Sequence, residues 1–225
     1  MTHSNIPATS NPTVDVFWSM RSSFCYLALD RLLALEAEWR VQVEIRVVYP
    51  VAIRNPEFFS TAPAHYRPYH LLDSQRVADF HGIPYRRPRP DPIVQDLATN
   101  AIADEQPYIH QLTRLAAAAQ IQGRALPFLD QVMRMIWDGS VDNWHQGDHL
   151  ADAITRSGMN ASALLNAVRE RPDEFDAVIE ANQTAQASAG HSGVPLCVFD
   201  GEPFFGQDRL ALLQWRLQQQ GVTRR

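Results

Sequence analysis

The stretch VDVFWSMRSSFC, residues 14–25, joins a short apolar run to the start of a helical pattern. Four of the five residues at 14–18 are β-branched or aromatic, which is typical of a strand. Over residues 23–38 the apolar side chains recur close to the period of a helix. Residues 41–49 alternate and end at Pro50, so they predict a second strand. Together these segments predict a β-α-β unit with parallel strands and a right-handed crossover.

Helical patterns fill the middle of the chain, from about residue 57 to residue 190, where strand signals are almost absent. The first predicted helix, residues 66–81, is stopped by Gly82-Ile83-Pro84. The stretch YRRPRPDP at 85–92 predicts an extended connector, because proline disfavours helix at its own position and at the one before it. Further helices are expected at residues 105–122, 126–137, 147–157, 160–170 and 172–189.

Strand character returns in LCVFDGEPFF, residues 196–205, where Asp200-Gly201 between two apolar runs predicts a hairpin. Residues 206–221 have the pattern of an amphipathic helix. This order predicts an α/β protein with a thioredoxin-like fold that is interrupted by an all-helical domain. The expected division is a disordered tail at 1–13, a thioredoxin-like domain at 14–56 and 190–225, and a helical insertion domain at 57–189.

The composition excludes several classes of partner. The 225 residues carry a formal net charge of −5 without a basic stripe, so a nucleic-acid partner is not expected. The apolar runs are too short to span a membrane, and the first residues lack the features of a signal peptide. We therefore expect a cytoplasmic protein whose two cysteines, Cys25 and Cys197, are reduced thiols.

Ser22 stands where a redox C-x-x-C motif has its first cysteine, and Cys25 stands at the second position. At the start of a helix, Ser22 would lie beside free backbone N–H groups and the positive end of the helix dipole, which favour an anion such as a thiolate. The alternative is that Ser22 only caps the helix. For Cys25 we expect inert packing in the core, with a mixed disulfide to a small external thiol as the alternative.

Two segments near the end of the chain offer binding groups. In Gly193-Val194-Pro195, a cis proline would expose the backbone of Val194 to an extended peptide, and an ordinary trans proline that begins a strand is the alternative. Asp208 lies in the first turn of the last predicted helix. It either compensates the helix dipole or receives the ammonium of an amino acid whose carboxylate binds the helix N–H groups.

Two other clusters carry less weight. His145 and His149 are four residues apart, but no third ligand and no H-E-x-x-H pattern accompany them, so we expect no metal site. The arginines of the connector are expected to be solvated, with attraction of an anionic substrate as the alternative. They are Arg86, Arg87 and Arg89.

These motifs carry a family resemblance that spans nearly all of residues 14–220. Ser22 in DVFWSMRSSFCYLA, Gly193-Val194-Pro195 and DGEPFFGQDRLALLQWRL at 200–217 resemble the glutathione-dependent 2-hydroxychromene-2-carboxylate isomerases. These enzymes are relatives of kappa-class glutathione transferases within the DsbA-like thioredoxin superfamily. The resemblance implies that Ser22 holds and activates the glutathione sulfur and that the backbone of Val194, beside Pro195, pairs with the cysteinyl unit. The residues that it implies for the γ-glutamyl end are Phe205, Gly206, Gln207 and Asp208.

The chain departs from the pattern of that family at several positions. Ser23 replaces the proline that usually follows the catalytic serine, and Ser19 replaces a common aspartate. Arg21 stands where a small apolar residue is usual, and Asp91 where an aromatic side chain contacts the substrate. The sequence offers no counterpart of the substrate-contacting lysine after the second strand.

The resemblance implies an isomerase of 2-hydroxychromene-2-carboxylate-like intermediates of aromatic degradation, with glutathione as cofactor and a small aromatic molecule as substrate. The implied mechanism is addition of the thiolate to a double bond, rotation and elimination. The alternatives are a kappa-like glutathione transferase and a non-catalytic protein that binds glutathione or a peptide. A dithiol oxidoreductase is disfavoured, because one cysteine in the motif cannot cycle a disulfide alone. The family tends toward dimers, so a homodimer is an open expectation.

Overall fold

A computed structural model describes residues 11–96 and 98–225. Its mixed sheet has the strand order β2-β1-β3-β4. The strands are β1 (Thr13–Trp18), β2 (Gln42–Val47), β3 (Leu196–Phe199) and β4 (Glu202–Phe205). β1 and β2 are parallel and are connected by helix α1 (Ser23–Glu38), whereas β3 is antiparallel to both β1 and β4. The predicted β-α-β unit and hairpin are therefore confirmed.

Local backbone chemistry explains the hairpin. Asp200 and Gly201 have positive φ angles of 50° and 76°, the combination that a two-residue type I′ turn requires. Strand β1 begins one residue earlier than predicted, because Thr13 already belongs to it and not to the expected tail. Residues 1–10 of that tail lie outside the described residues.

The helices follow the predicted pattern closely, and α4 has the predicted bounds. Two single-turn helices, α2 and α3, were not predicted, because four residues are too few to show a helical period. The last predicted helix begins with a 3₁₀ turn, η1 (Gln207–Arg209). The helices are α2 (Val51–Arg54), α3 (Phe58–Thr61), α4 (Tyr66–His81), α5 (Ile109–Ile121), α6 (Ala125–Trp137), α7 (His149–Arg156), α8 (Ala161–Glu170), α9 (Pro172–Ser188) and α10 (Leu210–Gln219).

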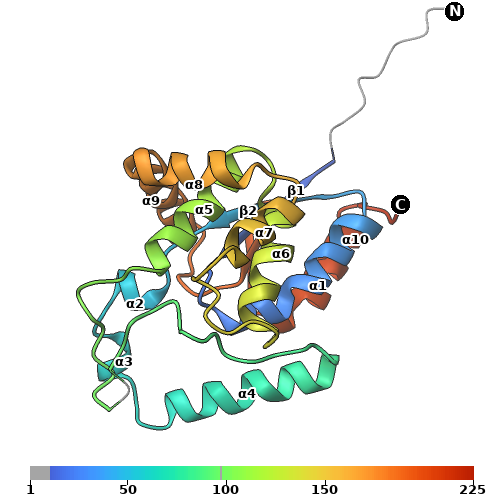
Figure 1. Cartoon of the computed structure of the whole chain (residues 1–225). Helices are drawn as coiled ribbons and strands as arrows, with labels where there is room; N and C mark the ends of the chain where they lie inside the picture. Colours follow the sequence, from blue (N-terminus) through green and yellow to red (C-terminus); the bar gives the residue numbers. More distant parts are fainter. Residues whose placement is uncertain (1–10, 97) are drawn as a thin grey trace, which may run out of the picture.

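One continuous hydrophobic cluster joins the sheet to the helices between residues 57 and 189. α5, α6 and α9 contact β2, and α1 contacts both α4 and α6. The inserted helices therefore share the core of the thioredoxin-like part, which fits the predicted fold class, while the domain boundaries stay a prediction. In Figure 1, α4 runs along the lower edge of the molecule, beside α1. This position makes the start of α4 one wall of the cleft described below.

The two cysteines, Cys25 and Cys197, are buried and free, as the sequence predicts. Among the described helices, none combines the length and the apolar character that crossing a bilayer needs.

Candidate active site

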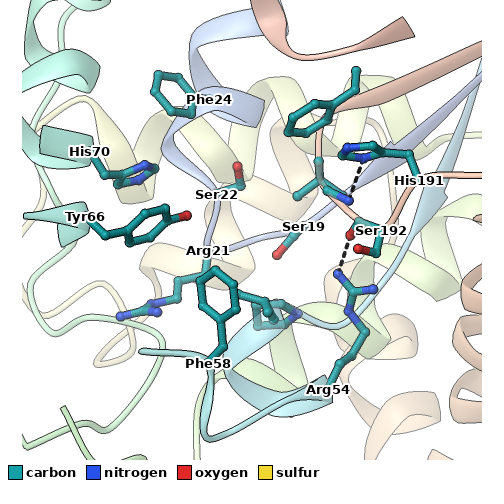
Figure 2. Close-up of a pocket in the computed structure, with 15 residues that line it drawn as sticks. Ser19, Arg21, Ser22, Phe24, Arg54, Phe58, Tyr66, His70, His191 and Ser192 are labelled. Carbon is teal, nitrogen blue, oxygen red and sulfur yellow. Dashed lines mark hydrogen bonds between the residues drawn. The ribbon is translucent and has the colours of Figure 1, made fainter. Parts of the chain in front are cut away.

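A cleft of about 350 Å³ opens at the N-terminus of α1. Figure 2 shows Ser19 and Ser22 at its centre, His70 and Tyr66 of α4 on one side, and His191, Ser192 and Arg54 on the other. None of the residues that line it is acidic. The lining residues are Ser19, Arg21, Ser22, Phe24, Pro50, Val51, Arg54, Phe58, Tyr66, His70, His191, Ser192, Gly193, Val194 and Phe205.

Ser22 both caps α1 and faces this cleft. Its backbone is extended, with φ −87° and ψ 117°, and its Oγ accepts a hydrogen bond of 3.2 Å from the backbone N–H of Cys25. Within the described chain, no group accepts the hydroxyl proton of Ser22. Because capping uses only a lone pair, the proton is free to donate to an anion in the cleft. The structural and functional interpretations of Ser22 are therefore compatible.

Ser19 adds a second hydroxyl to the same wall. Its side chain is 1% exposed, and its Oγ has no hydrogen-bond partner in the described part of the chain. Buried polar atoms are nearly always paired in folded proteins. Because Oγ itself has almost no exposed surface, the Ser19 hydroxyl is an unpaired polar group just behind the wall of the cleft.

Val194-Pro195 is a cis peptide bond. Among the described residues, nothing hydrogen-bonds to the backbone N–H or C=O of Val194, whereas Pro195 accepts a bond of 2.9 Å from the N–H of Gly206. The cis alternative is thus the one the structure adopts. Val194 keeps both backbone groups available at the cleft, and its pairing with a ligand stays a prediction.

Phe205 reaches the cleft by stacking on His191, with 3.8 Å between the ring centroids. The stack lies directly over Gly193. A Cβ atom at Gly193 would lie 2.3 Å from Cε2 of Phe205 and 2.8 Å from Cε1 of His191. The loop therefore needs glycine at this position to keep both rings in place.

Gln207 and Asp208 do not line this cleft. They border a separate hollow with Arg31 and residues from the second half of α4. Arg31 hydrogen-bonds to both the backbone carbonyl and the side chain of Gln207, and Asp208 pairs with Arg209 at 2.7 Å. Gly206 leaves room for the Asp208 carboxylate, because a Cβ there would lie 2.5 Å from its Oδ1. The predicted binding set is therefore divided between two hollows.

Arg54 is a cleft residue that sequence reasoning missed. It donates to the carbonyl of Ser192 at 2.9 Å and to Oε1 of Gln186 at 3.3 Å, and its buried Nε has no partner in the described chain. No carboxylate in that part of the chain pairs with it. Burial lowers its pKa, but an arginine remains charged at neutral pH. Arg54 thus places a cation after the second strand, where the sequence showed no lysine.

Three of the departures from the family pattern also have partners. Arg21 pairs with Asp91 at 2.9 Å, so two of these positions form one ion pair. Ser23 hydrogen-bonds to Nε2 of His70 at 3.1 Å and to Oγ of Ser74 at 3.0 Å. Neither partner in α4 carries a sequence signal, because the contacts cross 47 and 51 positions of the chain.

The sequence model of a protein family, the DsbA-like thioredoxin domain, matches residues 13–218 of the chain. The chain belongs to this family. It is similar in structure to a 2-hydroxychromene-2-carboxylate isomerase, with 19% identity, a TM-score of 0.68 and coverage of 92% of this chain and 95% of that one. A probable DsbA oxidoreductase from Streptomyces coelicolor has 18% identity, a TM-score of 0.63 and coverage of 92% and 89%. The cytosolic disulfide reductase DsbM from Pseudomonas aeruginosa, in its structure with GSH, has 16% identity, a TM-score of 0.57 and coverage of 92% and 99%. No curated protein sequence matches the chain.

This DsbA-like domain keeps both cysteines out of its cleft. Cys25 and Cys197 are absent from the cleft lining, and each is at most 1% exposed. Burial raises the pKa of both thiols to about 12. A thiol with such a pKa is almost entirely protonated at neutral pH and is a poor nucleophile. Sulfur chemistry in this cleft therefore requires a thiol from outside the chain.

Proposed function

We propose that this protein is a glutathione-dependent isomerase of 2-hydroxychromene-2-carboxylate-like intermediates of aromatic degradation. One observation carries the proposal: a helix N-terminus capped by Ser22 opens into a cleft that offers an anion site but no cysteine of its own. The helix N-terminus of a thiol-dependent site is present, and the attacking sulfur has to come from a bound ligand. The isomerase and the GSH-bound reductase among the structural relatives support this choice of reaction and ligand.

The groups of the cleft fit a thiol tripeptide. Ser22 and the first turn of α1 suit a sulfur anion, and the free N–H and C=O of Val194 suit an extended peptide backbone. Arg54 suits a carboxylate, because charged hydrogen bonds to guanidinium are strong and directional. When bound, the thiol supplies the nucleophile that adds to an electron-poor double bond and later leaves it.

The chain's own residues then stabilise the sulfur anion and orient the substrate. The hydroxyl of Ser22 donates a hydrogen bond to the sulfur anion. Preorganised donors of this kind lower the barrier because they need no rearrangement during the reaction. Phe24, Phe58 and Tyr66 provide aromatic walls against which a flat substrate can pack. The proposed roles of Phe205, Gly206, Gln207 and Asp208 toward the γ-glutamyl end stay predictions, and so does a homodimer.

Calorimetric titration with reduced glutathione tests the binding step. We expect a saturable signal for the wild type and a Kd about 10-fold to 100-fold higher for Arg54→Gln, the range that loss of a charged hydrogen bond predicts. Arg169→Gln removes an arginine with a 73% exposed side chain and is the matched control. Asp208→Ala asks whether the second hollow takes part. Absence of binding to the wild type would overturn the proposal.

Product analysis tests the reaction. Incubation of 2-hydroxychromene-2-carboxylate with protein and glutathione is expected to give an isomer of unchanged mass, and omission of glutathione is expected to stop the conversion. A product heavier by one glutathione would instead identify a transferase. Binding without turnover would leave the non-catalytic alternative.

A further inference from the structure

A chain of three polar side chains links α1 to α4 beneath the cleft. The hydroxyl of Ser74 donates to the backbone carbonyl of His70 at 2.7 Å. The Oγ atoms of Ser23 and Ser74 are 3.0 Å apart, and Ser23 Oγ lies 3.1 Å from Nε2 of His70. Ser23 and Ser74 are buried, so water does not compete for these bonds.

If these three hydrogen bonds form together, the number of protons in the chain sets the tautomer of His70. A hydroxyl has one proton, and Ser74 uses its proton on the backbone carbonyl. Ser23 must then donate its own proton to Ser74, which leaves Ser23 Oγ as an acceptor toward His70. Nε2 of His70 therefore carries the ring proton, and Nδ1 holds a free lone pair.

The lone pair of Nδ1 is accessible. The described chain contains no hydrogen-bond partner for Nδ1 of His70, and this atom is not sealed in the interior, unlike Nδ1 of His110 and of His145. Figure 2 shows the side chains of His70 and Tyr66 pointing from α4 toward Ser22. Phe24 meets the ring of His70 edge-on at 5.0 Å, and Tyr66 stacks on it at 6.3 Å.

The groups around His70 keep its ring neutral. Burial lowers its pKa below the ordinary 6.5, and the charges of Arg87 and Arg21 lower it further, against the opposing charge of Asp73. Tyr85 and the two serines add uncharged polar groups to these surroundings, because burial raises the pKa of Tyr85. A neutral imidazole with a free lone pair can accept a proton.

We propose that Nδ1 of His70 is the proton acceptor and donor of this cleft, with Ser23 as its positioning residue. This inference rests on the proposed function. His70 takes the proton of the bound thiol as the S–H bond breaks and the electron pair stays on sulfur. The ring holds this proton while the sulfur is bonded to substrate, and returns it once the C–S bond has broken. No oxidant or further reactant is needed.

Nitrogen NMR of the histidine rings tests the proposal without turnover. In the free protein we expect His70 to show the Nε2–H tautomer. Glutathione is expected to shift its Nδ1 resonance toward the imidazolium value, whereas S-methylglutathione, which has no thiol proton, is expected to leave it neutral. If calorimetry shows that both ligands bind and neither changes Nδ1, the role of His70 is wrong while the proposed function stands. If glutathione does not bind, both fail.

Substitutions separate chemistry from structure. His70→Gln is expected to lower kcat by about 10²-fold to 10⁴-fold, the usual contribution of a general base, with the Kd of glutathione nearly unchanged. Ser23→Pro removes the positioning hydroxyl together with one backbone N–H of the first turn. The helix should tolerate it, because proline fits the first residue of a helix and the extended backbone of Ser22 suits a following proline. In Ser23→Pro we expect the Nε2–H preference to disappear and kcat to fall less than in His70→Gln.

Added imidazole provides a rescue experiment. In His70→Ala it is expected to restore part of kcat, with a dependence on pH that follows the neutral imidazole. Wild-type kcat in His70→Gln with an unaltered pH profile would overturn the proposal. So would a His70 ring in the free protein that carries its proton on Nδ1.

Discussion

Arg21, which lines the cleft, and Asp91 lie 70 positions apart in the sequence and form an ion pair, with 2.9 Å between Nε and Oδ1. Arg87 joins the same carboxylate at 2.6 Å, and the backbone N–H of Ile93 donates to it at 2.9 Å. The guanidinium of Arg21 also lies over the ring of Phe59, 5.5 Å from its centroid. This cluster ties the start of α1 to the connector after α4, and it gives both departures from the family pattern one structural role.

Asp91→Asn is expected to destabilise the protein at neutral pH by about 2 kcal/mol, because Arg21 loses its charged partner in a half-buried position. Burial by itself would raise the pKa of Asp91, but Arg21, Arg87 and the N–H of Ile93 outweigh it and lower the pKa below the ordinary 3.8. A lowered folded-state pKa stabilises the fold above the unfolded-state pKa. The difference between variant and wild type should therefore shrink as the pH falls below 3.8.

Urea unfolding between pH 7 and pH 3 measures this difference. Glu174→Gln is the matched control, because Glu174 pairs with Arg171 on the surface, where both side chains are 56% exposed. We expect little change from that control at any pH. An Asp91→Asn protein as stable as the wild type at pH 7 would contradict the prediction.

Ser22 is expected to act on stability and on activity through different atoms. Ser22→Ala removes the cap and should cost about 1 kcal/mol of unfolding free energy, and it should lower kcat with glutathione by about 10²-fold. Ser22→Asp restores a good cap, but its carboxylate repels a sulfur anion. We therefore expect Ser22→Asp to recover stability and not activity. Recovery of both would show that Ser22 is only a cap, and Ser188→Ala, on α9, serves as the control for loss of an exposed hydroxyl.

Gly193→Ala is expected to displace the stacked rings of His191 and Phe205. The new Cβ would lie within 2.8 Å of both, so at least one ring has to move. Overpacking of this kind costs about 1–3 kcal/mol. We expect most of the loss, measured by urea unfolding, to disappear when Gly193→Ala is combined with Phe205→Ala. A loss of the same size in both backgrounds would mean that the strain lies in the loop backbone instead.

The thiols of Cys25 and Cys197 are expected to resist modification in the native protein. With a pKa of about 12, the thiolate fraction at pH 8 is on the order of 10⁻⁴, and burial blocks access as well. A chromogenic disulfide reagent should therefore react slowly with the native protein and rapidly with two thiols after denaturation in guanidinium. Cys25→Ala should keep glutathione-dependent activity. Fast labelling of Cys25 in the native state would favour the mixed-disulfide alternative.

Much of the fold could be predicted because its signals are local. The helical period of the apolar residues and the residues that start or stop a helix predict α1 and α4 at their observed bounds. Asp200-Gly201 predicts the hairpin, because both residues adopt positive φ angles. The short helices α2 and α3 have no such signal. Their position after Pro50 follows from packing against the rest of the chain.

The sequence alone determined the strand order along the chain, the serine that replaces a cysteine at the start of α1, and the family frame. Tertiary structure decided what surrounds Ser22. Arg54 becomes a cleft cation, His70 becomes an accessible base, and Gln207 and Asp208 fall into a neighbouring hollow. The physical reason is range: helix and turn signals arise from neighbours a few positions apart, whereas a site forms from side chains that meet only after α4 and the loop before β3 have packed onto the N-terminus of α1.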